Sequence, residues 1–110
     1  MTGRLRDLWL PEVEAEYRAL LSRNRDVGAD VGNQFRAFEQ VLRRGVDDKW
    51  RPIDHTNSAD IYVMYARHAL MFFAVQDYQA AIVKWTVLGS EYEQNQAREE
   101  ARRRAGQIFP

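Results

Sequence analysis

The chain of 110 residues contains no cysteine, which excludes disulfide bonds, a thiolate nucleophile and any zinc site that needs a Cys ligand. This absence is consistent with the reducing cytoplasm, where we expect the protein. Long hydrophobic runs are also missing, because the longest one, Ala69 to Val75, is much shorter than the roughly 20 apolar residues that cross a bilayer. We therefore expect neither a membrane span nor a secretory signal.

The chain also lacks an excess of either charge, since 16 Lys and Arg balance 16 Asp and Glu. A protein that neutralises many phosphates usually carries a basic surplus, so tight sequence-independent binding of nucleic acid is disfavoured. Apolar residues make up 45% and charged residues 29% of the chain, which is typical of a folded globular protein. Residues 1–110 are long enough for one core and too short for two, so we expect a single domain.

Two amphipathic helices are predicted in the first half of the chain. The first begins near Pro11, and its apolar stripe consists of Val13, Tyr17, Leu20 and Leu21. Residues 24–28 are expected to form a loop, after which either Asp26 or Asp30 caps a second helix that ends near Gly45. The stripe of this second helix consists of Val31, Phe35, Phe38, Val41 and Leu42. Because neither helix can bury its apolar face alone, we expect a helix hairpin that covers a third element.

Three short strands are predicted at residues 61–67, 70–75 and 81–88, which are rich in β-branched and aromatic side chains. Their close succession indicates an antiparallel meander. Residues 5–10 are a further candidate strand, placed beside the last one, and residues 50–53 are a candidate edge segment. The expected fold class is therefore α+β, with the helix hairpin packed on an antiparallel sheet of three to four strands and a helix at the C-terminus.

The predicted C-terminal helix begins at residue 91, because Ser90 and Glu93 form a capping box. Its stripe of small residues, Ala97, Ala101 and Ala105, allows close approach to the sheet or to a partner. Gly106 is expected to end this helix. The arginines at 102–104 are interpreted as a solvated helix end, with a phosphate clamp as the alternative.

Alternation along the strands suggests where polar side chains gather. Four such residues are predicted on one face of the sheet: Tyr65, Arg67, Lys84 and Thr86. In the last strand, Ile82 is expected on this same face and Val83 on the opposite one. A functional site is one interpretation of the charged pair, and an ordinary solvated face is the other.

The loop at residues 51–57 contains His55, whose ordinary pKa suits general acid or base chemistry. The alternative is a polar turn in which Asp54 and Asn57 bond their own backbone. The second histidine, His68, is 13 positions from His55 on a different element, so no ligand spacing joins them. With no glycine-rich phosphate loop either, we expect no metal and no cofactor.

The order of the expected elements, and several local strings, resemble the RelE/ParE superfamily of bacterial toxins and its HigB-like branch. Residues 9–17 resemble the family's first strand and helix, 35–42 its second helix, 62–75 its central hairpin, and 82–92 its last strand and following helix. The resemblance thus covers most of the chain. Where the family commonly has an arginine, an aliphatic pair and a tyrosine, this chain has Ala69-Leu70-Met71-Phe72.

This resemblance implies growth arrest, by ribosome-dependent cleavage of mRNA in the RelE and HigB branches or by gyrase poisoning in the ParE branch, with a cognate antitoxin as partner. A metal-independent endoribonuclease of this kind acts by general acid-base and electrostatic catalysis. Here Arg67 and Lys84 would hold phosphate charge, and His55 or His68 with Tyr65 or Tyr92 would move protons. The alternative is a catalytically silent module that binds a protein partner, or a second copy of itself, through the helix pair or the alanine stripe.

Overall fold

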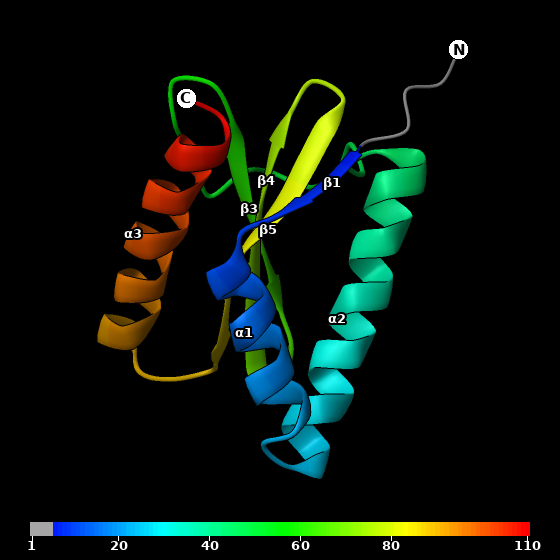
Figure 1. Cartoon of the computed structure of the whole chain (residues 1–110), viewed down its shortest axis with the longest axis vertical. Coiled ribbons are helices and arrows are strands. Elements are labelled where there is room, and N and C mark those ends of the chain that lie inside the picture. The colour runs from blue at the N-terminus through cyan, green and yellow to red at the C-terminus, as the bar shows by residue number, and fades with distance from the viewer. Residues whose placement is uncertain (1–5) are drawn as a thin grey trace.

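The computed structural model describes residues 6–110, which form an α+β fold of three helices and one five-stranded mixed sheet (Figure 1). The elements in chain order are β1 (Arg6–Trp9), α1 (Pro11–Leu21), α2 (Arg25–Arg44), β2 (Asp54–His55), β3 (Asp60–Tyr65), β4 (Ala69–Gln76), β5 (Gln79–Val87) and α3 (Glu91–Ile108). None of these helices is both long enough and apolar enough to cross a membrane.

The strands are ordered β1-β5-β4-β3-β2 in the sheet. The predicted meander is confirmed as β3, β4 and β5, which pair antiparallel. The predicted strand at 5–10 is also found beside the last strand, as β1, although its first residue lies outside the described part of the chain. The expectation of an antiparallel sheet of three to four strands was wrong, because β1 pairs with β5 in parallel and β2 adds a fifth strand.

The edge strand β2 lies slightly later in the chain than the predicted segment 50–53. His55 pairs with Asp60 and Asp54 with Ile61, while the Ile53 N–H donates to the Ile61 carbonyl. Pro52 has no N–H to donate, which explains why regular pairing begins only after it.

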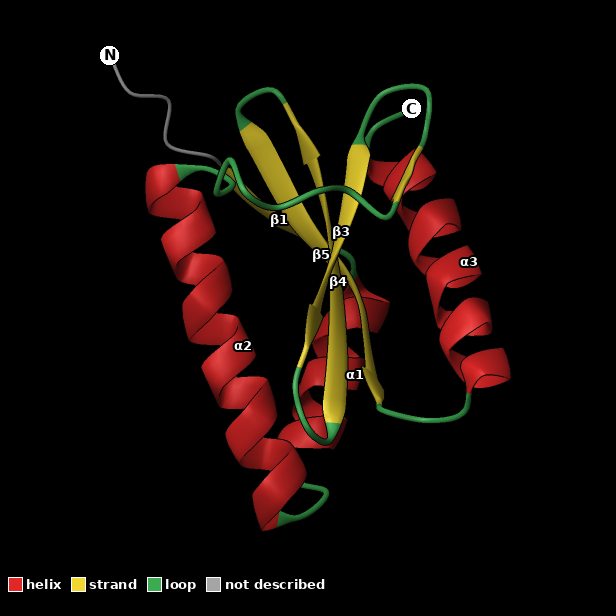
Figure 2. Ribbon diagram, turned by 180° about the vertical axis from the view of Figure 1, so that it is seen from behind, coloured by secondary structure: helices red, strands yellow, loops and turns green. Residues whose placement is uncertain are grey.

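The helices cover both faces of the sheet. Figure 2 shows α2 on one side of the strands and α3 on the other. On the first side, α1 and α2 bury Val13 and Phe38 against Phe73 and Trp85 of the sheet. On the second side, the alanine stripe Ala97, Ala101 and Ala105 packs with Leu70, Phe72 and Val83. The small side chains of α3 thus allow the close approach to the sheet that their spacing predicted.

Helix α2 begins earlier than predicted. The Asn24 side chain accepts a hydrogen bond of 3.0 Å from the Val27 N–H, so Asn24, and neither Asp26 nor Asp30, is the cap. Residues 25–28, expected to be loop, therefore belong to the helix. Asp30 instead accepts from the His68 N–H at 2.7 Å. The predicted end of the helix is confirmed at Gly45, whose φ of 81° is a conformation that favours glycine.

A β-bulge in β5 changes which side chains face α3. Phe72 lies opposite Lys84 while Phe73 lies opposite Ile82, so Val83 is an extra residue in β5. As a result, Ile82 packs in the core under the helix pair, whereas Val83 packs under α3. The prediction that Ile82 and Lys84 share a face was wrong, because strict alternation does not hold across a bulge.

Helix α3 extends beyond Gly106 to Ile108, so the predicted end at Gly106 was wrong. The predicted capping box at its start is confirmed, since the Ser90 hydroxyl accepts from the Glu93 N–H and the Glu93 carboxylate accepts from the Ser90 N–H. The Phe109 N–H closes the far end by donating to the Ala105 carbonyl. The buried Phe109 ring anchors this end of the helix to the sheet.

Candidate functional site

Lys84, a predicted phosphate ligand, lies between two carboxylates. Its Nζ is 2.9 Å from Oε2 of Glu16 on α1 and 2.6 Å from Oε1 of Glu100 on α3, and only 17% of its side chain is exposed. The hydrogen bond from Lys84 lowers the pKa of the Glu100 carboxyl, against an opposing effect of burial. The charge of Lys84 is therefore already compensated within the fold.

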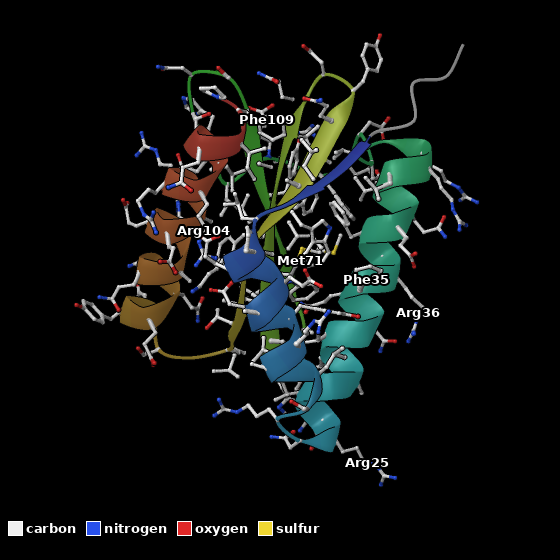
Figure 3. The ribbon with its side chains drawn as sticks, in the orientation of Figure 1. Arg25, Phe35, Arg36, Met71, Arg104 and Phe109 are labelled. Atoms are coloured by element: carbon white, nitrogen blue, oxygen red, sulfur yellow. The ribbon has the colours of Figure 1, made fainter. Side chains whose placement is uncertain are left out.

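Arg104 is the second cation of this cluster. Its Nη1 and Nη2 each lie 2.9 Å from an oxygen of the Glu16 carboxylate, which makes a bidentate ion pair. The side chain points from α3 toward α1 (Figure 3) and is 6% exposed. Burial alone would lower the pKa of Arg104, but the hydrogen bond with Glu16 and the charges of Glu16, Glu100 and Glu12 together outweigh it and raise this pKa. The interpretation of Arg104 as part of a solvated helix end was wrong.

The same ion pair completes one edge of the sheet. Pairing of β1 with β5 ends with Trp9 opposite Ile82. Just beyond this point, the Trp85 N–H donates to Glu16 at 3.1 Å, and Arg104 donates to the Val83 carbonyl at 3.0 Å. Side chains thus bond to the edge of β5 that β1 leaves uncovered, so the Glu16–Arg104 pair is part of the scaffold.

Four further candidates lie at the end of the sheet that contains the β3–β4 turn. Tyr65 is 66% exposed, and Leu70 pairs with both Tyr65 and Thr86, so these two side chains share the α3 face as predicted. Arg67 lies in the turn after β3, so the prediction that it shares the strand face was wrong. His68 accepts from the Leu88 N–H through its carbonyl.

Tyr92, the fourth of these, lies in the first turn of α3 and is 69% exposed. Its hydroxyl accepts a hydrogen bond of 2.9 Å from Gln96. Tyr92 follows directly after the segment that leaves β5 near the β3–β4 turn (Figure 1). We call the region that contains Tyr65, Arg67, His68, Leu88 and Tyr92 the turn end.

His55 lies at the other end of β3, opposite Asp60. It borders a hollow of about 460 Å³, lined by Thr56, Asn57, Glu99, Arg102, Arg103 and Gly106 together with His55 itself. The polar-turn interpretation holds for Asp54, which accepts from the His55 N–H at 2.8 Å. The six predicted site residues therefore occupy three separate places: the ion cluster, the turn end and this hollow.

Arg98 holds the loop that carries His55 against α3. Its guanidinium donates to the Ile53 carbonyl at 2.6 Å and to the Asp54 carboxylate at 3.3 Å. Burial raises the pKa of Asp54, but the hydrogen bonds from the His55 N–H and Arg98 and the charges of Arg98 and Arg102 together outweigh it, and the pKa falls below its ordinary value. Asp54 is thus a charged structural anchor beside the hollow.

Sequence reasoning did not single out Glu16 or Glu100, and it considered Arg102 only as part of the arginine run at 102–104. One usable signal was present, since Glu100 and Arg104 are four positions apart and lie 3.3 Å from each other. Nothing in the local pattern around Glu16 indicated its role, because its partners are 68 and 88 positions away in the chain.

The described residues contain no group of three His, Cys, Asp or Glu side chains that would hold a metal ion. The fold and these sites define an α+β protein with an internal ion cluster and two separate polar surfaces. Comparison with protein-family models, with curated proteins and with solved structures finds no match.

Proposed function

We propose that this chain is a toxin-like protein on a RelE/ParE-type scaffold that acts by binding a protein target, and that a cognate antitoxin masks it. The order of elements supports this proposal, because β1, the α1–α2 pair, the β3–β5 meander and α3 follow one another as in the family that the sequence resembles. Binding, and not cleavage of RNA, is the activity that the side chains support best.

The position of Lys84 carries this conclusion. An RNase of the proposed family would need a cation that is available to stabilise a cleaved phosphate. Lys84 instead contacts both Glu16 and Glu100, and a phosphate would have to displace these carboxylates. His55 is also separated from Tyr65 by the length of β3, so the two cannot share a proton-transfer step.

The turn end offers a surface for a protein target. Tyr65, Leu88 and Tyr92 expose 66%, 40% and 69% of their surface there. Large aromatic side chains that are exposed in a free protein are frequent anchors of protein interfaces. Arg67, in the turn that follows Tyr65, adds a residue type that is enriched at such interfaces.

Induction of the wild-type chain in a bacterial host tests this proposal, with growth and the 5′ ends of cellular mRNA measured together. We expect slower growth without new mRNA 5′ ends. New 5′ ends at induction would overturn the binding mechanism in favour of an endoribonuclease. Normal growth would overturn the toxin assignment and leave the alternative, a silent interaction module.

A further inference from the structure

The hollow beside His55 is formed by two segments that are far apart in the sequence. One wall is the loop at residues 55–57, and the other is the last part of α3, from Glu99 to Gly106. Its volume of about 460 Å³ is in the usual range for small-ligand sites, roughly 300–1,000 Å³. This hollow contains none of the residues of the turn end, the surface that we propose binds a protein.

Hydrogen bonds hold the loop to the helix on both sides of this hollow. On the N-terminal side of residues 55–57, Arg98 donates hydrogen bonds to Ile53 and Asp54. On their C-terminal side, the Ser58 hydroxyl donates to the Pro110 carbonyl at 2.9 Å. The Thr56 hydroxyl oxygen also accepts from the Ser58 and Ala59 N–H groups. The walls are therefore positioned before any ligand arrives, which lowers the entropic cost of binding.

The lining of the hollow is rich in hydrogen-bond donors. The Arg102 side chain forms no ion pair or hydrogen bond with any described side chain or carbonyl, although its charge acts on the nearby Asp54. The main chain and side chain of Asn57 likewise form no hydrogen bond in that range. The Thr56 hydroxyl has accepted two N–H groups, so its proton remains available to donate. Glu99 is the one carboxylate of the lining.

The carboxylates next to the hollow are already paired with cations. Asp54 is bound by Arg98. Glu16 and Glu100 are shared among Lys84, Arg103 and Arg104, and the charge of Glu12 also acts on Arg104. Arg103 lines the hollow but is paired with Glu100, so Arg102 is the arginine of the lining that no described carboxylate binds directly.

We propose that this hollow binds the phosphate group of a small phosphomonoester, such as a mononucleotide. The Arg102 guanidinium is the main ligand, because its planar fork matches two phosphate oxygens. Arg103, His55, Asn57 and Thr56 line the same hollow and supply further donors.

A single phosphate group suits this surface better than a nucleic-acid strand. A strand binds through several phosphates and needs a track of cations. On the other side of the same loop, a second hollow is lined by Asp60 and Asp77 together with His55, so a polyanion that continued past His55 would meet carboxylates. The chain as a whole also has no net charge.

Titration of the wild-type chain with 5′-AMP tests the proposal by calorimetry and by amide NMR shifts. We expect saturable binding with a Kd on the order of 1 mM at low salt, since exposed charges are screened by ions and the end of α3 adds partial negative charge. Shifts should concentrate at residues 55–57 and 99–106. Inorganic phosphate should compete, and adenosine, which has no phosphate, should not bind.

Arg102→Gln should weaken 5′-AMP binding about tenfold, through loss of a charge-assisted contact. Arg102 is exposed, so this variant should fold, which circular dichroism checks. Arg25→Gln is the matched control, because Arg25 is also exposed and points outward at the far end of the molecule (Figure 3). Its affinity should equal that of the wild type.

Three results would overturn the phosphate site. The first is absence of saturable binding of 5′-AMP by the wild-type chain. The second is equal loss of affinity in the Arg102 and Arg25 variants, or in neither. The third is a single-stranded RNA oligomer that binds far more tightly than 5′-AMP and loses affinity in the Arg102 variant, which would identify a nucleic-acid surface instead.

Discussion

Glu16 and Arg104 join helices from opposite faces of the sheet through two N–O contacts of 2.9 Å. Helix α1 contributes the carboxylate and α3 the guanidinium, and they meet where β1 no longer pairs with β5. The pair thus links three layers of the fold at one edge. Its side chains are only 21% and 6% exposed, so solvent screens this interaction less than it screens a surface pair.

Glu16→Gln should lower the free energy of unfolding by about 3 kcal/mol, because it leaves Arg104 buried with weaker compensation. Glu14→Gln is the matched control on the same helix. Glu14 pairs with Arg18 on the surface, and loss of that pair should cost less than about 0.5 kcal/mol. Urea denaturation measures both. Equal effects of the two substitutions would contradict a structural role for the Glu16–Arg104 pair.

Stability should fall in acid, and Glu100 should account for part of that fall. Its hydrogen bond from Lys84 lowers its folded-state pKa below the ordinary value of 4.5. A carboxyl whose pKa is lowered in the folded state stabilises the fold fully at pH values above 4.5. This stabilisation is lost as the pH falls through the folded-state pKa.

The Glu100→Gln variant should therefore be less stable than the wild type at about pH 7, and the difference should shrink toward about pH 3. Urea midpoints at a series of pH values measure this. A difference that stays constant over the whole range would show that Glu100 does not contribute through its charge.

Two glycines in α2 should respond in opposite directions to alanine. A Cβ at Gly28 would lie 2.7 Å from the Leu21 carbonyl oxygen, so Gly28→Ala should destabilise the protein by about 1–2 kcal/mol. At Gly32 the nearest atom would be the Arg36 side chain at 4.0 Å. Gly32→Ala should therefore gain up to about 1 kcal/mol of helix propensity. Thermal and urea unfolding compare the two, and equal signs would contradict the close approach of α1 and α2 at Gly28.

Tyr65→Ala and Tyr92→Ala should each relieve growth arrest if the turn end binds the proposed target. Truncation of an interface anchor typically costs about 2 kcal/mol or more of binding. Tyr78→Ala is the control, since Tyr78 is 68% exposed but lies next to Asp77 in the β4–β5 turn. Arrest that persists in both variants, or that is equally relieved by Tyr78→Ala, would place the binding surface elsewhere.

Local pattern was enough to predict the helices, the meander and the capping box. These features depend on neighbouring residues, such as the apolar spacing around Phe38 or the pair of Ser90 and Glu93. The start of α2 was missed because Asn24, Asp26 and Asp30 are all good cap residues, and only the folded structure shows that Asn24 bonds the Val27 N–H while Asp30 bonds the His68 N–H.

The candidate site was predicted less well than the fold. Tyr65 and Thr86 share a face as expected, because both lie opposite Leu70 in parts of β3 and β5 that pair regularly with β4. His55 was one of two histidines predicted to act with Tyr65 or Tyr92, yet β2 holds it at the opposite end of β3 from Tyr65. The sequence alone does not show this separation, because it depends on the end of the sheet at which each turn lies.

The amino-acid sequence by itself determined the order and type of the elements, since periodicity and caps are local properties. Tertiary structure alone decided the roles of the charges. The bulge at Val83 directs Lys84 toward α3, and the short β1 leaves an edge of β5 that Glu16 and Arg104 cover. Burial of a charge requires a partner, and these partners meet only after elements 68 and 88 residues apart have packed together.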